Sequence, residues 1–297
     1  MADDHERYDY SPIVERPDYD WPEGKRLAFY VAVNIEHFHF GKGLGPTPAP
    51  GSPTDQRSYA WRDYGNRVGV WRIFDLLDEL GWPACHLVNA AVCERYPQIL
   101  DRIAKRGDEI VGHGRTNSEA QGELWEADEA ALIDEATMTF VRHGFERPLG
   151  WMGPWISESP VTPDLLKEAG YLYVMDWPCD EQPIWMRTRA GPILSVPYPA
   201  EVNDVPAMLR RFGSANDFGR MITDQFDQLL ALADDAPLVC GIALHPMVVG
   251  QPFRLVHLRS AFEHIARHEG AGNVWFTRPG EIARHVIGLP AGTVPGG

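Results

Sequence analysis

Ionisable side chains directly follow an apolar stretch near the start of the chain. The segment VAVNIEHFHF, residues 31–40, is mostly apolar until it places Glu36 next to His37. Two more imidazoles end apolar stretches later in the sequence, His113 in EIVGHGRTN and His245 in CGIALHPM. Carboxylates and imidazoles exchange protons with substrates near neutral pH. These residues could therefore carry general acid–base chemistry if the fold brings them to one place.

The elements that would position these groups follow from the hydrophobic pattern. Apolar stretches alternate with segments of helical period, which is typical of βα units around a parallel sheet. We predict strands at 27–35, 84–89, 109–112, 149–152, 171–175, 193–196, 238–243 and 273–276. We predict helices at 69–81, 96–105, 126–143, 163–169, 218–233, 256–268 and 280–287. Loops that leave the carboxyl ends of parallel strands open on one edge, where active sites are built. Glu36, His113 and His245 fall in such loops, and so do Asn117, Trp155, Glu158, Trp177 and Asn203.

Length and composition favour one catalytic domain. With 297 residues, 44% of them hydrophobic, the chain can bury a large core. We expect a single domain over 1–297, with an N-terminal extension at 1–24 and an irregular tail at 288–297. The formal net charge of −15 argues against nucleic acid and anionic membranes as partners and leaves a small-molecule substrate. No secretion signal and no apolar run of roughly 18 residues is present, so we expect a cytoplasmic protein.

Other residue types carry weaker signals. Four cysteines occur without a Cys-x-x-Cys pair, which argues against a disulfide framework and a structural zinc site. The segment 43–55 is rich in Pro and Gly, and we expect it to be irregular and to form a lid or a subunit contact. Three histidines of the predicted helix 256–268 fall away from the polar edge and are expected on the surface: His257, His264 and His268.

Over residues 25–285, the order of these pieces resembles the polysaccharide deacetylase family, whose NodB-like domain is a distorted α/β barrel of seven or eight βα units. In its metal-dependent members, two adjacent aspartates end the first strand, a His-x-x-x-His pair after the third strand completes the metal site, and a Leu-x-His motif supplies a general acid. The corresponding motifs here read Glu36-His37, His113-Gly-Arg-Thr-Asn117 and Ala243-Leu244-His245. Because an asparagine amide is a poor ligand for zinc, the family's metal site is incomplete in this chain.

The sequence is more similar to a branch of that superfamily, the metal-independent allantoinases and cyclic imide hydrolases. In the allantoinase branch the acidic pair carries glutamate and the second histidine of the His-x-x-x-His motif is lost, as at Glu36 and Asn117 here. The stretches 64–81 and 244–265 also resemble this branch. The resemblance implies a hydrolase that opens a C–N bond of a small cyclic amide, such as an imide, a ureide or a hydantoin-like ring, without a metal or other cofactor.

In that reaction each polar group has an expected role. Glu36 is the candidate base that activates water, and His245 is the candidate acid that protonates the leaving nitrogen. His113, His37 and Asn117 would position the water and the carbonyl, with Asn117 donating to the oxyanion. The expected ring-binding residues are Trp155, Trp177 and Phe38 as flat walls, and Glu158 and Asn203 as hydrogen-bonding partners.

Other interpretations stay open at this point. A metal-dependent N-deacetylase of an acetylated amino sugar would use His37 and His113 as zinc ligands, and a non-catalytic carbohydrate-binding or regulatory protein would need neither. Trp155 and Trp177 could be core residues, and Glu158 could cap a helix or form a salt bridge. The retained base and acid positions favour an enzyme. Because close relatives are often tetramers, the resemblance also makes a homo-oligomer possible.

Overall fold

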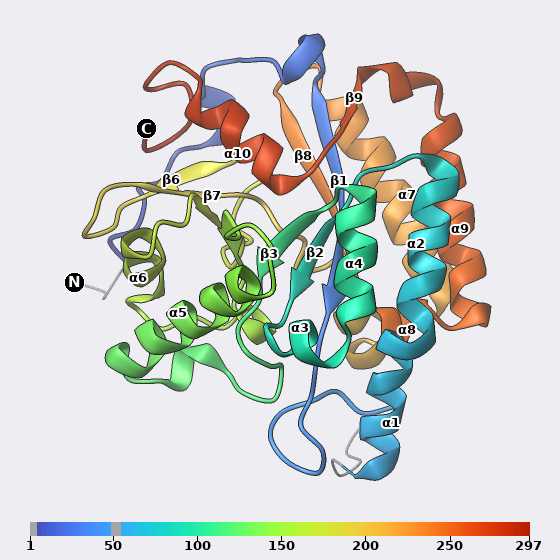
Figure 1. Ribbon diagram of the computed structural model, residues 1–297. Coiled ribbons are helices and arrows are strands. Elements are labelled where there is room, and N and C mark those ends of the chain that lie inside the picture. Colours follow the sequence, from blue (N-terminus) through green and yellow to red (C-terminus); the bar gives the residue numbers. More distant parts are fainter. Residues whose placement is uncertain (1–4, 49–54) are drawn as a thin grey trace.

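The computed structural model describes residues 5–48 and 55–297, and its described part is built on one nine-stranded sheet (Figure 1). The strands are β1 Leu27–Ile35, β2 Cys85–Val88, β3 Glu109–Gly112, β4 Gly150–Trp151, β5 Tyr173–Val174, β6 Ile184–Met186, β7 Ile193–Ser195, β8 Leu238–Leu244 and β9 Val274–Phe276. Their order is β6-β7-β5-β4-β3-β2-β1-β8, with β9 paired to the start of β1. All pairs are parallel except β6 with β7.

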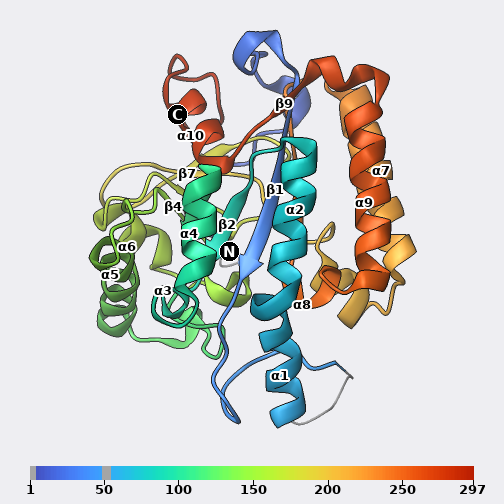
Figure 2. The same cartoon turned by 45° about the vertical axis from the view of Figure 1, so that its right-hand side comes forward.

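Helices cover the outside of this sheet (Figures 1 and 2). The α-helices are α1 Gln56–Tyr64, α2 Val70–Leu80, α3 Ala91–Arg95, α4 Pro97–Arg106, α5 Glu126–Arg142, α6 Thr162–Glu168, α7 Ala215–Leu232, α8 Pro246–Val249, α9 Pro252–Arg267 and α10 Pro279–Ile287. Two π-helical turns occur at Gly65–Gly69 and Val205–Arg210. Short 3₁₀ turns occur at Ile13–Glu15, Pro22–Gly24, Gln121–Glu123, Pro154–Ile156 and Glu269–Asn273. No helix in the described ranges is both long and apolar enough to cross a bilayer.

Strand β1 lies between two hydrophobic cores, which explains why its sequence is apolar apart from Asn34, whose amide donates to Tyr198 and to the carbonyl of Leu244. All nine of its residues are buried. Phe29 and Val31 belong to the large core beneath the helices, whereas Tyr30 and Ala32 belong to a second core inside the curled sheet. A parallel strand that is covered on both faces has no polar side, so the alternation of a half-exposed strand is lost.

The predicted α/β fold is confirmed as a curled half-barrel, and most predicted elements match. Helix α2 ends where its pattern indicates, with Gly81 in the left-handed region at φ 66°. Strand β6 was not predicted, because three residues between Pro183 and Arg187 give too short an alternation to recognise. Of the Pro- and Gly-rich segment 43–55, residues 43–48 are irregular and residues 49–54 lie outside the described part of the chain.

The half-barrel is closed by an irregular connection instead of a ladder between β6 and β8. We call residues 199–213 the seam segment. Ala243 of β8 donates its backbone N–H to Val202, and a single bridge pairs Asn203 with Ala243. The N-terminal extension also docks on β8, since the indole of Trp21 donates to the carbonyl of Leu238 at 3.0 Å. All four cysteines are free thiols, as expected.

Candidate active site

A carboxylate and two imidazoles meet at the carboxyl edge of the sheet. Glu36 follows β1, His113 follows β3 and His245 follows β8, and the parallel registers of these neighbouring strands bring their ends together. His245 Nε2 lies 3.6 Å and His113 Nε2 3.7 Å from the same Glu36 oxygen, Oε1. All three residues are buried. The structure therefore joins the three predicted catalytic residues into one cluster.

The His245 ring is held by a second buried carboxylate. Nδ1 donates to Asp204 Oδ1 at 2.6 Å, and the backbone N–H of His245 donates to Asp204 Oδ2 at 2.8 Å. Asp204 lies in the seam segment and is fully buried. Burial opposes charge on His245, but the carboxylates of Asp204 and Glu36 favour it more, so the pKa of His245 is raised above its ordinary value. This arrangement turns Nε2 toward Glu36 and favours its protonation.

His113 has the opposite hydrogen-bonding arrangement. Its Nδ1 donates to the backbone carbonyl of Met152 at 2.7 Å, so the neutral ring leaves Nε2 unprotonated. That buried Nε2 has no hydrogen-bond partner among the described residues. It can accept a hydrogen bond from a water or from a substrate N–H. Met152 thus serves the site through its backbone carbonyl.

An asparagine pair fixes the side chain of Asn117. Asn89 Nδ2 donates to Asn117 Oδ1 at 2.8 Å, and Asn117 Nδ2 in turn donates to Glu36 Oε1. Asn89 is fully buried, and its own Oδ1 accepts the backbone N–H of His37 at 2.8 Å. The amide N–H₂ of Asn117 therefore points at the carboxylate and its oxygen points away. One amide N–H of Asn117 thus orients the base, and its expected donation to the oxyanion stays a prediction, since Asn117 also lines the pocket.

The same orientation decides whether the family's metal would fit. A divalent ion beside Glu36 and His113 needs a third donor, and the family's third position is Asn117. Here that position presents amide hydrogens, which repel a cation. In the described ranges no set of three metal-ligating side chains includes Glu36, His113 or His37. The residues present do not fit the metal.

A pocket of about 230 Å³ opens above the three catalytic candidates. It is lined by residues from β1 and from five loops: Asn34, Glu36, Pro46, His113, Asn117, Met152, Trp155, Ile156, Tyr198, Ala200, Asn203, Val205, Pro206, Arg210, His245 and Met247. The predicted contacts Trp155 and Asn203 are among them. Trp155 is held in the left-handed region at φ 68°, and its indole donates to the carbonyl of Asn117 at 3.0 Å.

His37 lies outside this pocket, which corrects the expectation that it positions water or binds a metal there. Successive side chains of an extended segment point to opposite sides, so Glu36 and His37 cannot face the same space. The His37 ring lines a separate hollow with Arg95, and its Nδ1 lies 3.3 Å from the hydroxyl of Tyr96. Burial, aided by the charge of Arg95, lowers the pKa of His37 to about 4.

Glu158 and Trp177 are also placed away from the pocket. Trp177 Nε1 donates to Glu158 Oε2 at 2.8 Å, and the indole packs edge-on against Tyr8 of the N-terminal extension. Burial raises the pKa of Glu158 to about 7, although the hydrogen bonds from Trp177 and Asp176 oppose this shift. Their hydrogen bond joins the loops after β4 and β5, and neither side chain lines the pocket around Glu36. Phe38, the third expected wall, is covered by the guanidinium of Arg62 at 4.6 Å from its ring.

Sequence reasoning missed several residues of the site. Asn89 and Asp204 act on side chains that are distant in sequence, and neither belongs to a motif. Asp204, like its neighbour Asn203, follows the sixth predicted strand. Its place at the carboxyl end of that strand could therefore have marked it as a candidate. Arg210 lines the pocket from the seam segment, and Tyr198 lines it from the residue just before that segment; neither region carries a repeated pattern.

A curled α/β half-barrel with a carboxylate between two imidazoles defines a class, the hydrolases of NodB-like fold. Comparisons with known proteins agree with this class. The crystal structure of Puue allantoinase superposes with a TM-score of 0.81 at 30% identity, covering 93% of this chain and 97% of that one. Among curated proteins, the "Putative polysaccharide deacetylase" of Schizosaccharomyces pombe is 26% identical over 92% of this chain and 93% of its own length.

The peptidoglycan deacetylase of Helicobacter pylori is 24% identical, over 72% of this chain and 83% of its own length. No family model matches the sequence. The full-length similarity to the allantoinase, together with the deacetylase relatives, shows that the chain belongs to the polysaccharide deacetylase superfamily. Deacetylases and allantoinases both hydrolyse C–N bonds, and a C–N hydrolase is the activity that these relatives support in general.

Proposed function

We propose that this hydrolase opens a C–N bond of a small cyclic amide, an imide, ureide or hydantoin-like ring, by general base activation of water. The observation that carries the proposal is the single Glu36 oxygen faced by two imidazoles in a site whose donors do not fit a metal. A carboxylate that no cation neutralises can accept the proton of a water directly.

The reaction can be followed atom by atom. Water placed between Glu36 and His113 gives a proton to Glu36 as its oxygen attacks the ring carbonyl carbon. His245 then gives its Nε2 proton to the ring nitrogen as the C–N bond breaks. The proton on Glu36 returns to His245, whose Nε2 is 3.6 Å away. The product is a ring-opened amide with a new carboxylic acid, and both enzyme groups regain their first protonation states.

The shape and lining of the pocket support a small ring over a polymer. A space of about 230 Å³ admits one small molecule, and Trp155 and Tyr198 offer it flat faces. Arg210 is exposed at the lining, and no hydrogen bond or ion pair joins it to another described residue. Its guanidinium is therefore available for a carbonyl or carboxylate oxygen of the ring or its substituent.

The first experiment measures turnover of succinimide, hydantoin and allantoin by the purified protein, before and after chelation. We expect ring opening that survives the chelator and falls about 10²–10⁴-fold in Glu36→Gln, the range typical of a lost general base. Glu109→Gln is the matched control. Glu109 is a half-buried carboxylate at the opposite edge of the sheet, where it accepts from Tyr173 and Gly280 at 2.8 Å each, and its variant should turn over like wild type.

A second function is favoured by the names of the two curated relatives: a metal-dependent N-deacetylase acting on an acetylated amino sugar. It predicts acetate release from N-acetylated glucosamine oligomers that stops on chelation and returns with zinc. That result, with no ring opened, would replace the cyclic amidase proposal. It would also require the Asn117 side-chain amide to flip, so that its oxygen faces the metal.

A further inference from the structure

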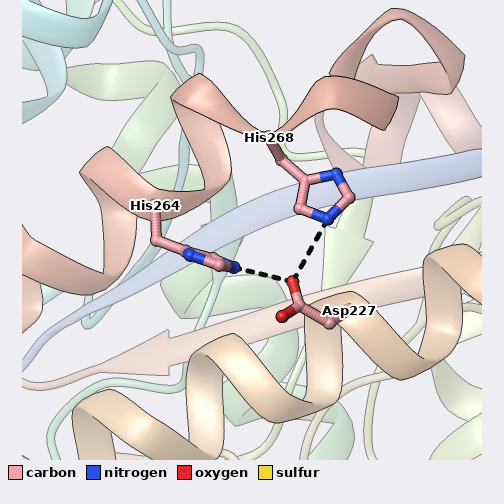
Figure 3. Close-up of side chains that lie close together, drawn as sticks. All are labelled: Asp227, His264 and His268. Carbon is pink, nitrogen blue, oxygen red and sulfur yellow. Dashed lines mark hydrogen bonds and ion pairs between the residues drawn. The ribbon is translucent and has the colours of Figure 1, made fainter.

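Two histidines and an aspartate form a second polar cluster on the outer surface, on helices that the proposed reaction does not use (Figure 3). His264 lies on α9, His268 follows directly after the last residue of that helix, and Asp227 faces both from α7. Figure 2 shows these two helices side by side on the outside of the molecule. His264 Nε2 lies 2.8 Å and His268 Nε2 lies 3.7 Å from Asp227 Oδ1.

The spacing of the three donor atoms suits a tetrahedral ion. Zinc binds imidazole nitrogen and carboxylate oxygen at about 2.0–2.1 Å, which separates adjacent ligand atoms by about 3.3 Å in a tetrahedron. The two measured separations, 2.8 and 3.7 Å, lie on either side of that value. All three ligand atoms lie within 4.8 Å of one another, so small side-chain rotations would bring them onto one ion.

The backbone of the cluster is already fixed by apolar packing. Phe226 and Leu230 of α7 and Phe262 and Ile265 of α9 are buried in the large core. The rings of His264 and His268 are 5.7 Å apart, and the His268 ring also packs edge-on against Phe226. Little chain entropy remains to be lost when an ion binds, so the ligands are largely preorganised.

Protons compete with an ion at this place. His268 Nδ1 accepts the backbone N–H of Gly270 at 3.0 Å, so Nε2 carries the proton in the neutral ring. An ion on Nε2 displaces that proton and requires the Gly270 contact to be given up. Binding is therefore weaker than in a closed structural zinc site, and it weakens further as the pH falls.

We propose that Asp227, His264 and His268 bind one divalent transition-metal ion of the zinc class, with water completing the coordination. Nitrogen donors select zinc, cobalt, nickel or copper over magnesium and calcium. The bound ion joins α7 to α9 and stabilises the folded chain. The site stands apart from the pocket around Glu36, so it is independent of the proposed hydrolysis.

The test is a calorimetric titration of the chelator-stripped full chain with zinc chloride, for wild type and for His264→Ala/His268→Ala. We expect wild type to bind one equivalent more than the double variant. Its melting temperature should rise by about 4 °C at a zinc concentration 100 times Kd, a shift that the double variant lacks. Cobalt should give visible absorption of a tetrahedral site in wild type alone.

The control is His257→Ala, which removes a histidine of the same helix outside the cluster and should bind zinc like wild type. Unchanged turnover and circular dichroism of the double variant would show that its fold is intact. Equal zinc stoichiometry in wild type and double variant would overturn the proposal, and so would the absence of any binding to wild type. Zinc held at the pocket as well would appear in both proteins and leave the difference of one equivalent.

Discussion

At the scale of single residues, Asp204 determines how His245 acts. Both carboxylate oxygens of Asp204 bind His245, one at the ring and one at the backbone, so the imidazole can neither flip nor change its tautomer without losing a bond. Asp204 is a positioning residue, because it does not line the pocket and reaches the substrate only through His245. Its charge also sets the protonation of the acid.

We predict that Asp204→Asn lowers kcat/KM about 10²–10⁴-fold and changes its pH dependence. His245 acts in its protonated form, and its raised pKa keeps it protonated to higher pH than an ordinary histidine. Activity should therefore fall only as the pH rises through that pKa. Without the Asp204 charge the pKa drops, so the alkaline limb of the pH–kcat/KM profile moves to lower pH. A lower rate with an unmoved limb would reduce Asp204 to a packing role.

The residues of the cluster were predictable from their place after parallel strands, whereas the direction of individual side chains was not. Glu36, His113 and His245 share one edge of the sheet, as expected. His37 follows Glu36 directly and so points to the other side. Glu158 turns away because the chain reverses through left-handed backbone at Trp155, a conformation that no sequence pattern announces.

At the scale of elements, the loop after β3 approaches the loop after β4 closely at a glycine. Gly114 has φ +64°, and a Cβ placed on it would lie 2.7 Å from Cγ and 3.0 Å from Cδ of Pro154. The loop after β3 carries His113 and Asn117, and the loop after β4 carries Trp155. Their close approach at this glycine therefore sets the distance between the catalytic cluster and the aromatic wall.

We predict that Gly114→Ala destabilises the fold by about 2–4 kcal/mol, through left-handed strain and the clash with Pro154 together. The matched control is Gly107→Ala at the end of α4, where φ is +69° but no atom lies within 4 Å of the added Cβ. Strain alone should cost it about 1–2 kcal/mol. Urea unfolding measures both changes, and only Gly114→Ala should also lower kcat/KM. If Gly114→Ala and Gly107→Ala lost the same stability and the same activity, the contact with Pro154 would be unimportant.

Regular elements followed from periodicity, and irregular ones did not. The spacing of Val70, Phe74 and Leu77 predicted α2 closely, and the long apolar runs predicted β1 and β8. The π-helical turn Val205–Arg210 and the short strand β6 have no period long enough to read. They form where tertiary packing overrides local preference, and Val205–Arg210 carries part of the pocket.

At the scale of the whole molecule, the two sides of the site differ in how firmly they are held. Strand β1 is paired with β2 and β8 and is buried on both faces. The seam segment reaches β8 through one bridge between Asn203 and Ala243. The base therefore stands on the most constrained strand, and Asp204 stands on the least regular connection.

We predict that amide hydrogens of β1 exchange only on global unfolding, whereas those of the seam segment exchange by local opening at least 10-fold faster, since about 1.4 kcal/mol of local stability corresponds to that factor. Hydrogen–deuterium exchange followed by mass spectrometry of peptides measures both regions in one experiment. Peptides from α7, which begins just after the seam segment, provide the internal comparison. Seam amides as slow as those of β1 would mean that the barrel closes as firmly there as elsewhere.

The pairing of β1 with β8 also has a consequence for synthesis. The register joins Leu27 to Leu238 and Val33 to Leu244. Strand β1 therefore cannot complete this pairing until residues 238–244 have been synthesised. On the ribosome, the base emerges early and the acid late, and a chain whose synthesis stops before β8 contains Glu36 but lacks His245. A truncated product of this gene would therefore expose the edge of β1 that β8 covers, on a strand that is almost entirely apolar, which makes it a substrate for chaperones and proteases before it could ever be a slow enzyme.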